Sequence, residues 1–316
     1  MTEAIPLPDK YAMLLERCHG LPAIPTAVAH PCDASSLSGA MEAAQLGLIQ
    51  PILVGPEARI RQVAEEQGVS LGGVRIVDAP HSHAAAETAV ALVRSGEAEL
   101  LMKGSLHTDE LLHEVARGAS GLRTGRRLSH VFAMDVPGYH KPLFITDAAV
   151  NIFPDLNDKA DIVRNAIELV QVLGVERPKV AILSAVETVT DKIPSTIDAA
   201  ALCKMSDRGQ IEGGILDGPL AFDNAISKEA ARAKGIVSEV AGDPDILLVP
   251  DLEAGNMLAK QLTFLSGAEA AGIVLGARVP IILTSRADTV RARIGSCAVA
   301  VLVAHARRAA STTVQV

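Results

Sequence analysis

The sequence is poor in aromatic side chains: Trp is absent, and aromatic residues make up 2% of its 316 residues. A protein that binds single-stranded nucleic acid needs aromatic platforms on which the bases stack. The formal net charge of −8 also gives no broad basic surface for nucleic acid or for an anionic membrane. We therefore expect neither nucleic acid nor a membrane as a partner.

Cysteine and long apolar runs are also scarce. No CxxC pair and no zinc-finger spacing of Cys and His occurs, so we expect reduced, mostly buried thiols. The four cysteines are Cys18, Cys32, Cys203 and Cys297. The longest apolar run, Cys297–Ala304, is far too short to span a bilayer, and Met1–Lys10 has no signal-peptide pattern. These features predict a cytoplasmic protein.

The familiar cofactor signatures are missing. The chain has no GxGxxG after a strand, no GxxxxGK[ST], no HExxH and no GxSxG. A ligand that carries phosphate would have to be bound by helix N-termini and by individual basic residues. We expect no cofactor and no metal ion.

What the sequence does contain is a regular alternation of elements. Short β-rich runs alternate with Ala-rich helical patterns, as is typical of parallel βαβ units. In a first block the expected strands are 26–29, 51–54, 74–77, 100–103, 131–135 and 143–146. Helices are expected between the earlier ones at 36–46, 57–67 and 82–94.

A second block begins after Pro154. Its expected strands are 180–183, 214–216, 246–249, 271–275 and 281–283, with helices near 158–173, 194–206, 221–233 and 255–266. Two α/β blocks predict two domains with a cleft between them. The first boundary is predicted near 139–153, where Pro137-Gly138, Pro142 and Pro154 punctuate a polar stretch. We assign residues 1–140 and 290–316 to the first domain and residues 141–289 to the second.

The segment Leu283–Asp288, LTSRAD, combines a hydroxyl, a guanidinium and a carboxylate within a few residues. It follows an expected strand, and ligands of α/β proteins bind outside the carboxyl ends of parallel strands. Ser285 can donate to an oxyanion, Arg286 can neutralise an anion, and Asp288 can accept a proton. Ser and Asp are also ordinary helix N-cap residues, so a simple helix start is the competing interpretation.

Four segments together resemble the phosphate acetyltransferase and phosphate butyryltransferase family. They are Met102–Thr108 (MKGSLHT), Asp217–Leu220 with Asp223, Val249–Asn256 (VPDLEAGN) and the SRAD turn, in the family's order. The resemblance implies two three-layer α/β/α domains of the isocitrate/isopropylmalate-dehydrogenase type, with the final helix, about 289–308, folded back onto the first domain. It also implies a homodimer.

The implied activity is reversible acyl transfer between coenzyme A and inorganic phosphate, with acetyl-CoA and phosphate in equilibrium with acetyl phosphate and CoA. CoA is then a substrate. Arg286 suits the binding of phosphate, and Ser285 suits stabilisation of the oxyanion. One departure matters: the family's catalytic aspartate falls on Ala292 here. Either Asp288 replaces it or thiolate formation relies on cations alone.

Further residues are candidates for binding substrates. Lys103, His107 and Thr108 follow an expected strand, and the basic stretch Arg123, Arg126 and Arg127 suits phosphate groups, although solvated surface arginines are the alternative. The resemblance also assigns Asp217, Asp223, Asp251 and Asn256 to the cleft; routine capping of strand-to-helix corners is their alternative role.

Three functions are compatible with these observations. The first is a phosphate acyltransferase, with acetyl as the first choice of acyl group and butyryl as the second. The second is a metal- and NAD-dependent dehydrogenase on the same scaffold, although the nine His show no ligand spacing. The third is a non-catalytic acyl-CoA-binding protein, which the alanine at position 292 suggests.

Overall fold

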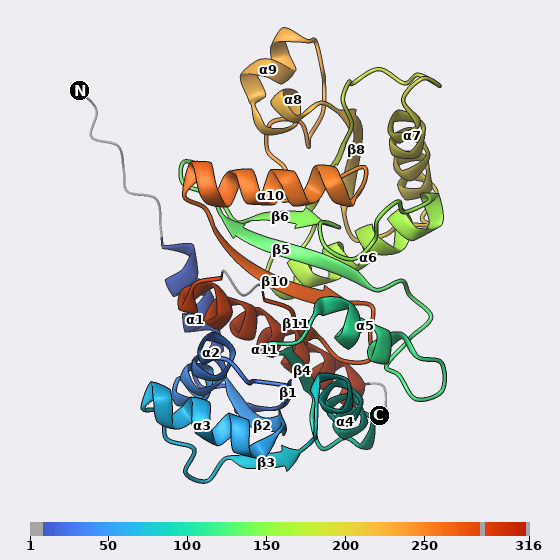
Figure 1. Ribbon diagram of the computed structural model, residues 1–316. Coiled ribbons are helices and arrows are strands. Elements are labelled where there is room, and N and C mark those ends of the chain that lie inside the picture. The colour runs from blue at the N-terminus through green and yellow to red at the C-terminus, as the bar shows by residue number, and fades with distance from the viewer. Residues whose placement is uncertain (1–8, 285–287, 314–316) are drawn as a thin grey trace, which may run out of the picture. The chain divides into compact units, whose positions relative to one another are not determined.

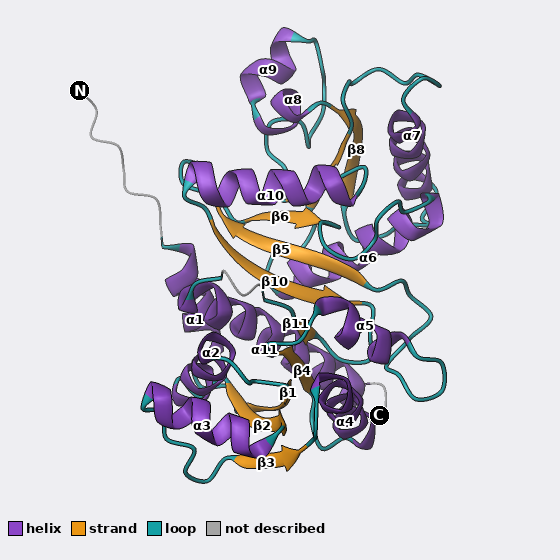
Figure 2. Cartoon of the chain, viewed as in Figure 1, coloured by secondary structure: helices purple, strands orange, loops and turns teal. Residues whose placement is uncertain are grey.

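The computed structural model describes residues 9–284 and 288–313, which form an α/β fold (Figure 1). Helices and strands alternate along most of the chain, as the sequence predicts (Figure 2). The chain divides into two compact units. We call residues 11–126 with 271–316 the β1 unit, and residues 1–10 with 127–270 the β5 unit.

The β1 unit is built on strands in the order β3-β2-β1-β4-β11-β10. All neighbouring pairs in this unit are parallel except β10 and β11, which are antiparallel. The strands are β1 (Ile24–Ala29), β2 (Ile49–Gly55), β3 (Arg75–Asp78), β4 (Leu100–Lys103), β10 (Glu269–Leu275) and β11 (Ile281–Ile282). The helices are α1 (Lys10–Cys18), α2 (Ala34–Gln45), α3 (Glu57–Gln67), α4 (Ser82–Ser95), α5 (Thr108–Ala116) and α11 (Val290–Thr313).

The strand order explains where these helices lie. From β1 the chain moves outward to β2 and β3, so right-handed crossovers place α2 and α3 on one face of the sheet. It then returns past β1 to β4, which places α4 on the other face. Helix α11 packs on α2, and α5 packs on α4. All four residues of β4 are buried, as expected for a central parallel strand that is covered on both faces.

The β5 unit has the strand order β5-β6-β9-β7-β8. Strand β5 is antiparallel to β6, and the other neighbours are parallel. The strands are β5 (Ser129–Asp135), β6 (Leu143–Thr146), β7 (Lys179–Leu183), β8 (Ile215–Leu220) and β9 (Ile246–Leu248). The helices are α6 (Leu156–Val172), α7 (Pro194–Asp207), α8 (Phe222–Ile226), α9 (Lys228–Ala233) and α10 (Leu252–Ser266).

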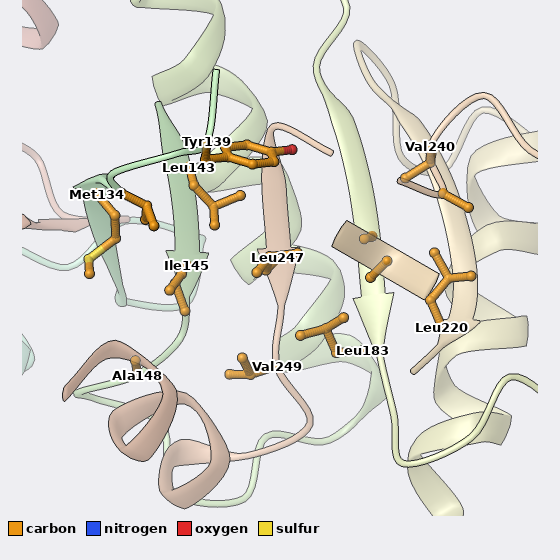
Figure 3. Close-up of a cluster of buried hydrophobic side chains, with 14 of the residues drawn as sticks. Met134, Tyr139, Leu143, Ile145, Ala148, Leu183, Leu220, Val240, Leu247 and Val249 are labelled. Atoms are coloured by element: carbon orange, nitrogen blue, oxygen red, sulfur yellow. The ribbon is translucent and has the colours of Figure 1, made fainter. Parts of the chain in front are cut away.

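A cluster of buried apolar side chains holds this unit together (Figure 3). Alternate residues of a strand point to the same face, so Leu143 and Ile145 of β6 lie on the face that also carries Leu183 and Leu247. Partly buried leucines of α10 pack against them. Full burial of one such side chain contributes about 1.5–3 kcal/mol to folding.

Two expectations about strand placement need correction. The alternation of elements was typical of parallel βαβ units, but the pairs β5–β6 and β10–β11 are antiparallel. It also assigned the strands at 271–275 and 281–283 to the second block. In the structure β11 is parallel to β4, so both strands continue the sheet of the β1 unit. Conversely, β5 pairs with β6 and belongs to the β5 unit, so the units differ in their bounds from the predicted domains.

The predicted helix 221–233 is two short helices. Ser227 interrupts it because the backbone there is extended and the Ser227 side chain accepts a hydrogen bond from the amide of Ala230, which starts α9 as an N-cap. The four cysteines are free, and three of them are buried, as expected. Within the described part of the chain, no helix combines the length and the apolar character needed to cross a bilayer.

Candidate functional site

In the β1 unit three parallel strands end side by side. Ala29 of β1 pairs with Lys103 of β4, and Met102 pairs with Ile282 of β11. The segments that follow these strands, beginning at His30, Gly104 and Leu283, therefore emerge at one edge of the sheet. Of the segments recognised in the sequence, MKGSLHT begins on β4, and LTSRAD begins directly after the adjacent strand β11. Ser285 and Arg286 themselves lie outside the described residues.

The turn after β4 is tightly built. The side chain of Lys103 is buried, and its ammonium donates to the carbonyl oxygens of Gly104 and Leu106, both at 3.1 Å. A Cβ atom at Gly104 would lie 2.3 Å from the carbonyl oxygen of Ala29, so only glycine allows the two backbones to approach this closely. Lys103 was expected to bind substrate. The structure shows that its ammonium also holds the turn that positions Ser105.

Ser105 and His30 form a compact hydrogen-bonded pair. The hydroxyl of Ser105 donates to the carbonyl oxygen of His30 at 2.8 Å, and Oγ lies 2.9 Å from Nδ1 of the same histidine. The amide of Cys32 also donates to Oγ, at 3.4 Å. His30 has φ of 56°, the left-handed region that residues other than glycine seldom adopt. Sequence reasoning missed His30, although it follows an expected strand just as Lys103 does.

Charges around His30 act in opposite directions. Burial lowers the pKa of His30 below its usual 6.5, while the carboxylates of Glu110 and Asp33 favour its charged form and His81 opposes it. Burial would by itself raise the pKa of Asp33, but hydrogen bonds from Ser36 and Ser35 and the charge of Arg293 lower it. Asp33 is therefore an anion at neutral pH, and His30 is neutral.

Helix α5 begins at this edge with two predicted site residues. His107 is the N-cap residue but makes no side-chain capping bond, and it is exposed; Thr108 is the first helical residue and is half-buried. Asp109 and Glu110 occupy the first turn, where carboxylates stabilise the positive end of the helix. These carboxylates make the start of α5 a poorer site for an anion than a bare N-terminus would be.

The start of α11 shows which residue caps this helix. Oγ1 of Thr289 accepts a hydrogen bond from the amide of Ala292 at 3.1 Å, so Thr289 performs the N-cap role. The carbonyl oxygen of Asp288 accepts from Arg293 at 3.3 Å, and Arg293 is buried at 3% exposure. Ala292 is buried at 9% exposure. Asp288 is therefore not needed as the cap.

The predicted basic stretch is divided between the two units. Arg123 and Arg126 belong to the β1 unit and are exposed. Arg127 belongs to the β5 unit, where Nε donates to Oδ1 of Asn151 at 2.7 Å and the guanidinium lies 3.5 Å from Asp158. The charge of Arg127 is therefore partly balanced within its own unit.

At the carboxyl end of β6 in the β5 unit, Asp147 organises a turn. Its carboxylate accepts hydrogen bonds from the amides of Ala149, Val150 and Asn151 and from the Asn151 side chain. Burial raises the pKa of Asp147 in spite of these bonds. The neighbouring strand contributes His130, whose pKa burial lowers to about 3. Sequence reasoning did not select either residue.

Two of the residues assigned from the family resemblance lie at this same edge. Asp251 is the N-cap of α10 and accepts from the amide of Ala254 at 2.8 Å. Asn256, in the second turn, donates to the carbonyl oxygen of Ala148 at 3.1 Å. Asn256 thereby connects α10 to the turn after β6, whereas the bond of Asp251 caps α10 itself. Their observed contacts fit the capping alternative as well as a binding role.

Asp217 and Asp223 were expected at strand-to-helix corners, and for Asp217 this placement was wrong. Asp217 is the third residue of β8, paired with Ala181, because the strand continues through Gly218-Pro219 to Leu220. Asp223 does lie at the corner, in α8, where it forms an ion pair with Lys234 at 3.1 Å. A surface hollow of about 370 Å³ lies near the start of β8, away from the carboxyl ends of the strands.

Residues 80–301 match the family model described as "Phosphate acetyl/butaryl transferase". The chain belongs to this family. It is 69% identical to a phosphate acetyltransferase of Rhizobium meliloti over 303 residues, which cover 96% of each chain. It is 43% identical to a phosphate butyryltransferase of Clostridium beijerinckii over 291 residues, 92% of this chain and 96% of that relative.

The fold agrees with that membership. The structure of a branched-chain phosphotransacylase from Enterococcus faecalis V583 matches with a TM-score of 0.78 and 31% identity. That match covers 89% of this chain and 99% of the other. The resemblance that the four segments indicated in the sequence is thus confirmed.

Proposed function

We propose that the protein is a phosphate acetyltransferase that converts acetyl-CoA and inorganic phosphate reversibly into acetyl phosphate and CoA. The observation that carries the proposal is the 69% identity over 96% of the chain to an enzyme of that name. The butyryltransferase relative is 43% identical, so acetyl is the first choice of acyl group.

The chemistry assigns a task to each expected residue. A phosphate oxygen attacks the thioester carbonyl carbon, a tetrahedral oxyanion forms, and the C–S bond breaks to release CoA thiolate, which takes up a proton. Arg286 binds the phosphate and Ser285 donates to the oxyanion. Asp288 is the carboxylate nearest to this pair in the sequence and is one candidate for the proton-transfer group. No cofactor or metal ion takes part.

Substrate binding is assigned to the residues at the strand edges. Arg123 and Arg126 are exposed cations suited to the phosphates of CoA, with Arg127 as a further candidate. Lys103, His107 and Thr108 are assigned to the β1 unit's part of the site, and Asp217, Asp251 and Asn256 to that of the β5 unit. The isocitrate/isopropylmalate-dehydrogenase scaffold with a cleft between its domains stays a prediction from the family resemblance, as does the cytoplasmic location.

A homodimer is part of the same proposal. Apolar side chains that project from one helix support it, because Met257, Phe264 and Leu265 of α10 are 64%, 75% and 79% exposed. Light scattering at micromolar concentration tests it. We expect a dimer mass for the wild type and a monomer mass for Phe264→Asp. A monomeric wild type would contradict this part of the proposal.

The activity is tested by release of free thiol from acetyl-CoA. We expect release that depends on added phosphate and that neither a chelator nor NAD changes. Release that requires a metal ion, or reduction of NAD in place of thiol release, would favour the dehydrogenase alternative. Binding of acetyl-CoA without any release would favour the non-catalytic alternative.

A further inference from the structure

His30 stands at the edge of the sheet where the Ser-Arg segment begins. Extending the strand registers by one or two residues places His30 beside Gly104 and Gly104 beside Thr284. Neighbouring strands are spaced about 4.8 Å apart, so His30 and Thr284 are about 10 Å apart across this edge. Ligands of α/β proteins bind outside the carboxyl ends of parallel strands, so the imidazole of His30 lies where a ligand of the β1 unit would bind.

The contacts of Ser105 are compatible with a ring that carries its proton on Nδ1. When the hydroxyl proton of Ser105 goes to the carbonyl oxygen of His30, Oγ can accept from Nδ1–H of the imidazole. In that tautomer the neutral ring has its lone pair on Nε2. No described residue forms a hydrogen bond with that nitrogen.

The surroundings of His30 suit a group that accepts a proton and later returns it. Burial keeps the resting imidazole neutral, whereas Glu110 of α5 and Asp33 before α2 stabilise the imidazolium once it has formed. His81, before α4, opposes the charge. One carboxylate oxygen of Glu110 is buried without a hydrogen-bond partner among the described residues. A cation close to this oxygen would relieve that unfavourable burial.

We propose that His30 is the general base that takes the thiol proton of CoA. The inference rests on the proposed acetyl transfer. In the direction that forms acetyl-CoA, Nε2 accepts the S–H proton while the thiolate sulfur attacks the carbonyl carbon of acetyl phosphate. The C–S bond forms, the bond between the carbonyl carbon and the bridging phosphate oxygen breaks, and phosphate leaves. The imidazolium then returns its proton to solvent or to the departing phosphate. In the reverse direction the imidazolium protonates the leaving thiolate.

This assignment supplies a base although the family's aspartate is absent from this sequence. The position of the family's aspartate is Ala292, buried at the start of α11. His30 approaches the same edge from β1 and would supply a base of a different kind. It deepens the proposed function because it names the residue that moves the proton.

The first test compares His30→Asn with wild type in the acetyl-CoA-forming direction. Asparagine tolerates the left-handed backbone, and its amide can still donate to Ser105, but it has no base at the Nε2 position. We expect kcat to fall at least about 100-fold, since a general base contributes about 10²–10⁴. His113→Gln, an exposed histidine on α5, is the matched control and should keep the wild-type rate.

The pH profile separates catalysis from packing. A base must be neutral to act, so wild-type kcat should rise with pH through a pKa below 6.5 and then level off. His30→Asn should lack this acidic limb. If His30→Asn keeps more than half of the wild-type kcat, or keeps the limb while Asp288→Asn loses it, the proposal is wrong and the base is Asp288 or another group.

Chemical rescue covers the case in which His30→Asn folds poorly. His30→Gly fits the positive φ without strain, and added imidazole should restore its activity in proportion to the concentration of neutral imidazole. A well-folded, inactive His30→Gly that imidazole does not restore would contradict a base role. Failure of the proposed function would give a different result. The wild type itself would then release no thiol from acetyl-CoA in the presence of phosphate.

Discussion

The Oγ atom of Ser105 lies 2.9 Å from Nδ1 of His30 and 2.8 Å from the carbonyl oxygen of the same residue. Ser105 thus fixes both the backbone and the ring of the histidine. Strands β1 and β4 bring the two residues together, although they are 75 positions apart in the sequence. The pairing therefore holds the imidazole of His30 in one orientation at the carboxyl ends of the β1-unit strands.

Ser105→Ala should therefore impair turnover more than binding. Without Oγ the ring loses the acceptor for Nδ1–H, so both tautomers and several orientations become available. We expect kcat to fall at least about tenfold, with KM for CoA changed less than twofold. Initial rates measured over pH 5–8 check this expectation. An unchanged kcat would mean that the Ser105 bond only holds the turn.

Thr289→Ala should destabilise the fold, because Thr289 caps α11 through the amide of Ala292. The loss of a threonine N-cap costs about 1 kcal/mol. Urea unfolding measures this change, and Asp288→Asn is the matched comparison that should cost less. If Asp288→Asn proves the more destabilising of the two, then Asp288 has the structural role that its place before the helix suggests.

Salt dependence distinguishes Arg126 from Arg127. Both side chains are exposed, but Arg127 contacts Asn151 and Asp158 in the β5 unit, whereas Arg126 belongs to the β1 unit. We expect Arg126→Gln to raise KM for acetyl-CoA about fivefold, or about 1 kcal/mol, and to weaken the rise of KM with ionic strength. Arg127→Gln should chiefly lower stability. Equal increases of KM for acetyl-CoA in the two variants would indicate that both guanidinium groups contact CoA. If neither variant changes KM, the basic stretch is a solvated loop without a role in CoA binding.

Local patterns in the sequence were sufficient for many element bounds. Helix α3 and strands β4 and β6 have the predicted residues. For α3 the neighbouring Pro56 and Gly68 mark the two ends locally. The pairing of β11 with β4 could not be predicted in this way, since those strands lie about 180 residues apart in the sequence and no local signal records which strands pair.

The same limit explains what was found and missed at the candidate site. Asp251 and Asn256 were expected at a strand-to-helix corner, and they lie at one because α10 follows β9 directly. His30 was missed because its role depends on Ser105, which only the β1–β4 pairing brings near. The capping role of Thr289 was also missed, because Ser285 and Asp288 are equally good caps by residue type.

Arg286→Ala should abolish most of the activity without unfolding the protein. Arg286 is the cation assigned to phosphate and to the developing oxyanion, and removal of one such donor costs about 10²–10³ in rate. Arg286→Lys should recover only part, because an ammonium cannot donate as a fork. Steady-state kinetics and a thermal melt check both points. An Arg286→Ala enzyme with more than about half of the wild-type kcat/KM would refute the assignment.

The most direct test of the account is the ratio of kcat/KM for acetyl-CoA and butyryl-CoA with phosphate as the second substrate. Each additional methylene changes transition-state binding by roughly 1–3 kcal/mol in a pocket shaped for one acyl group. A phosphate acetyltransferase should therefore prefer acetyl-CoA at least about tenfold. Equal or greater kcat/KM with butyryl-CoA would make the protein a butyryltransferase, and no phosphate-dependent thiol release with either thioester would contradict the proposed function itself.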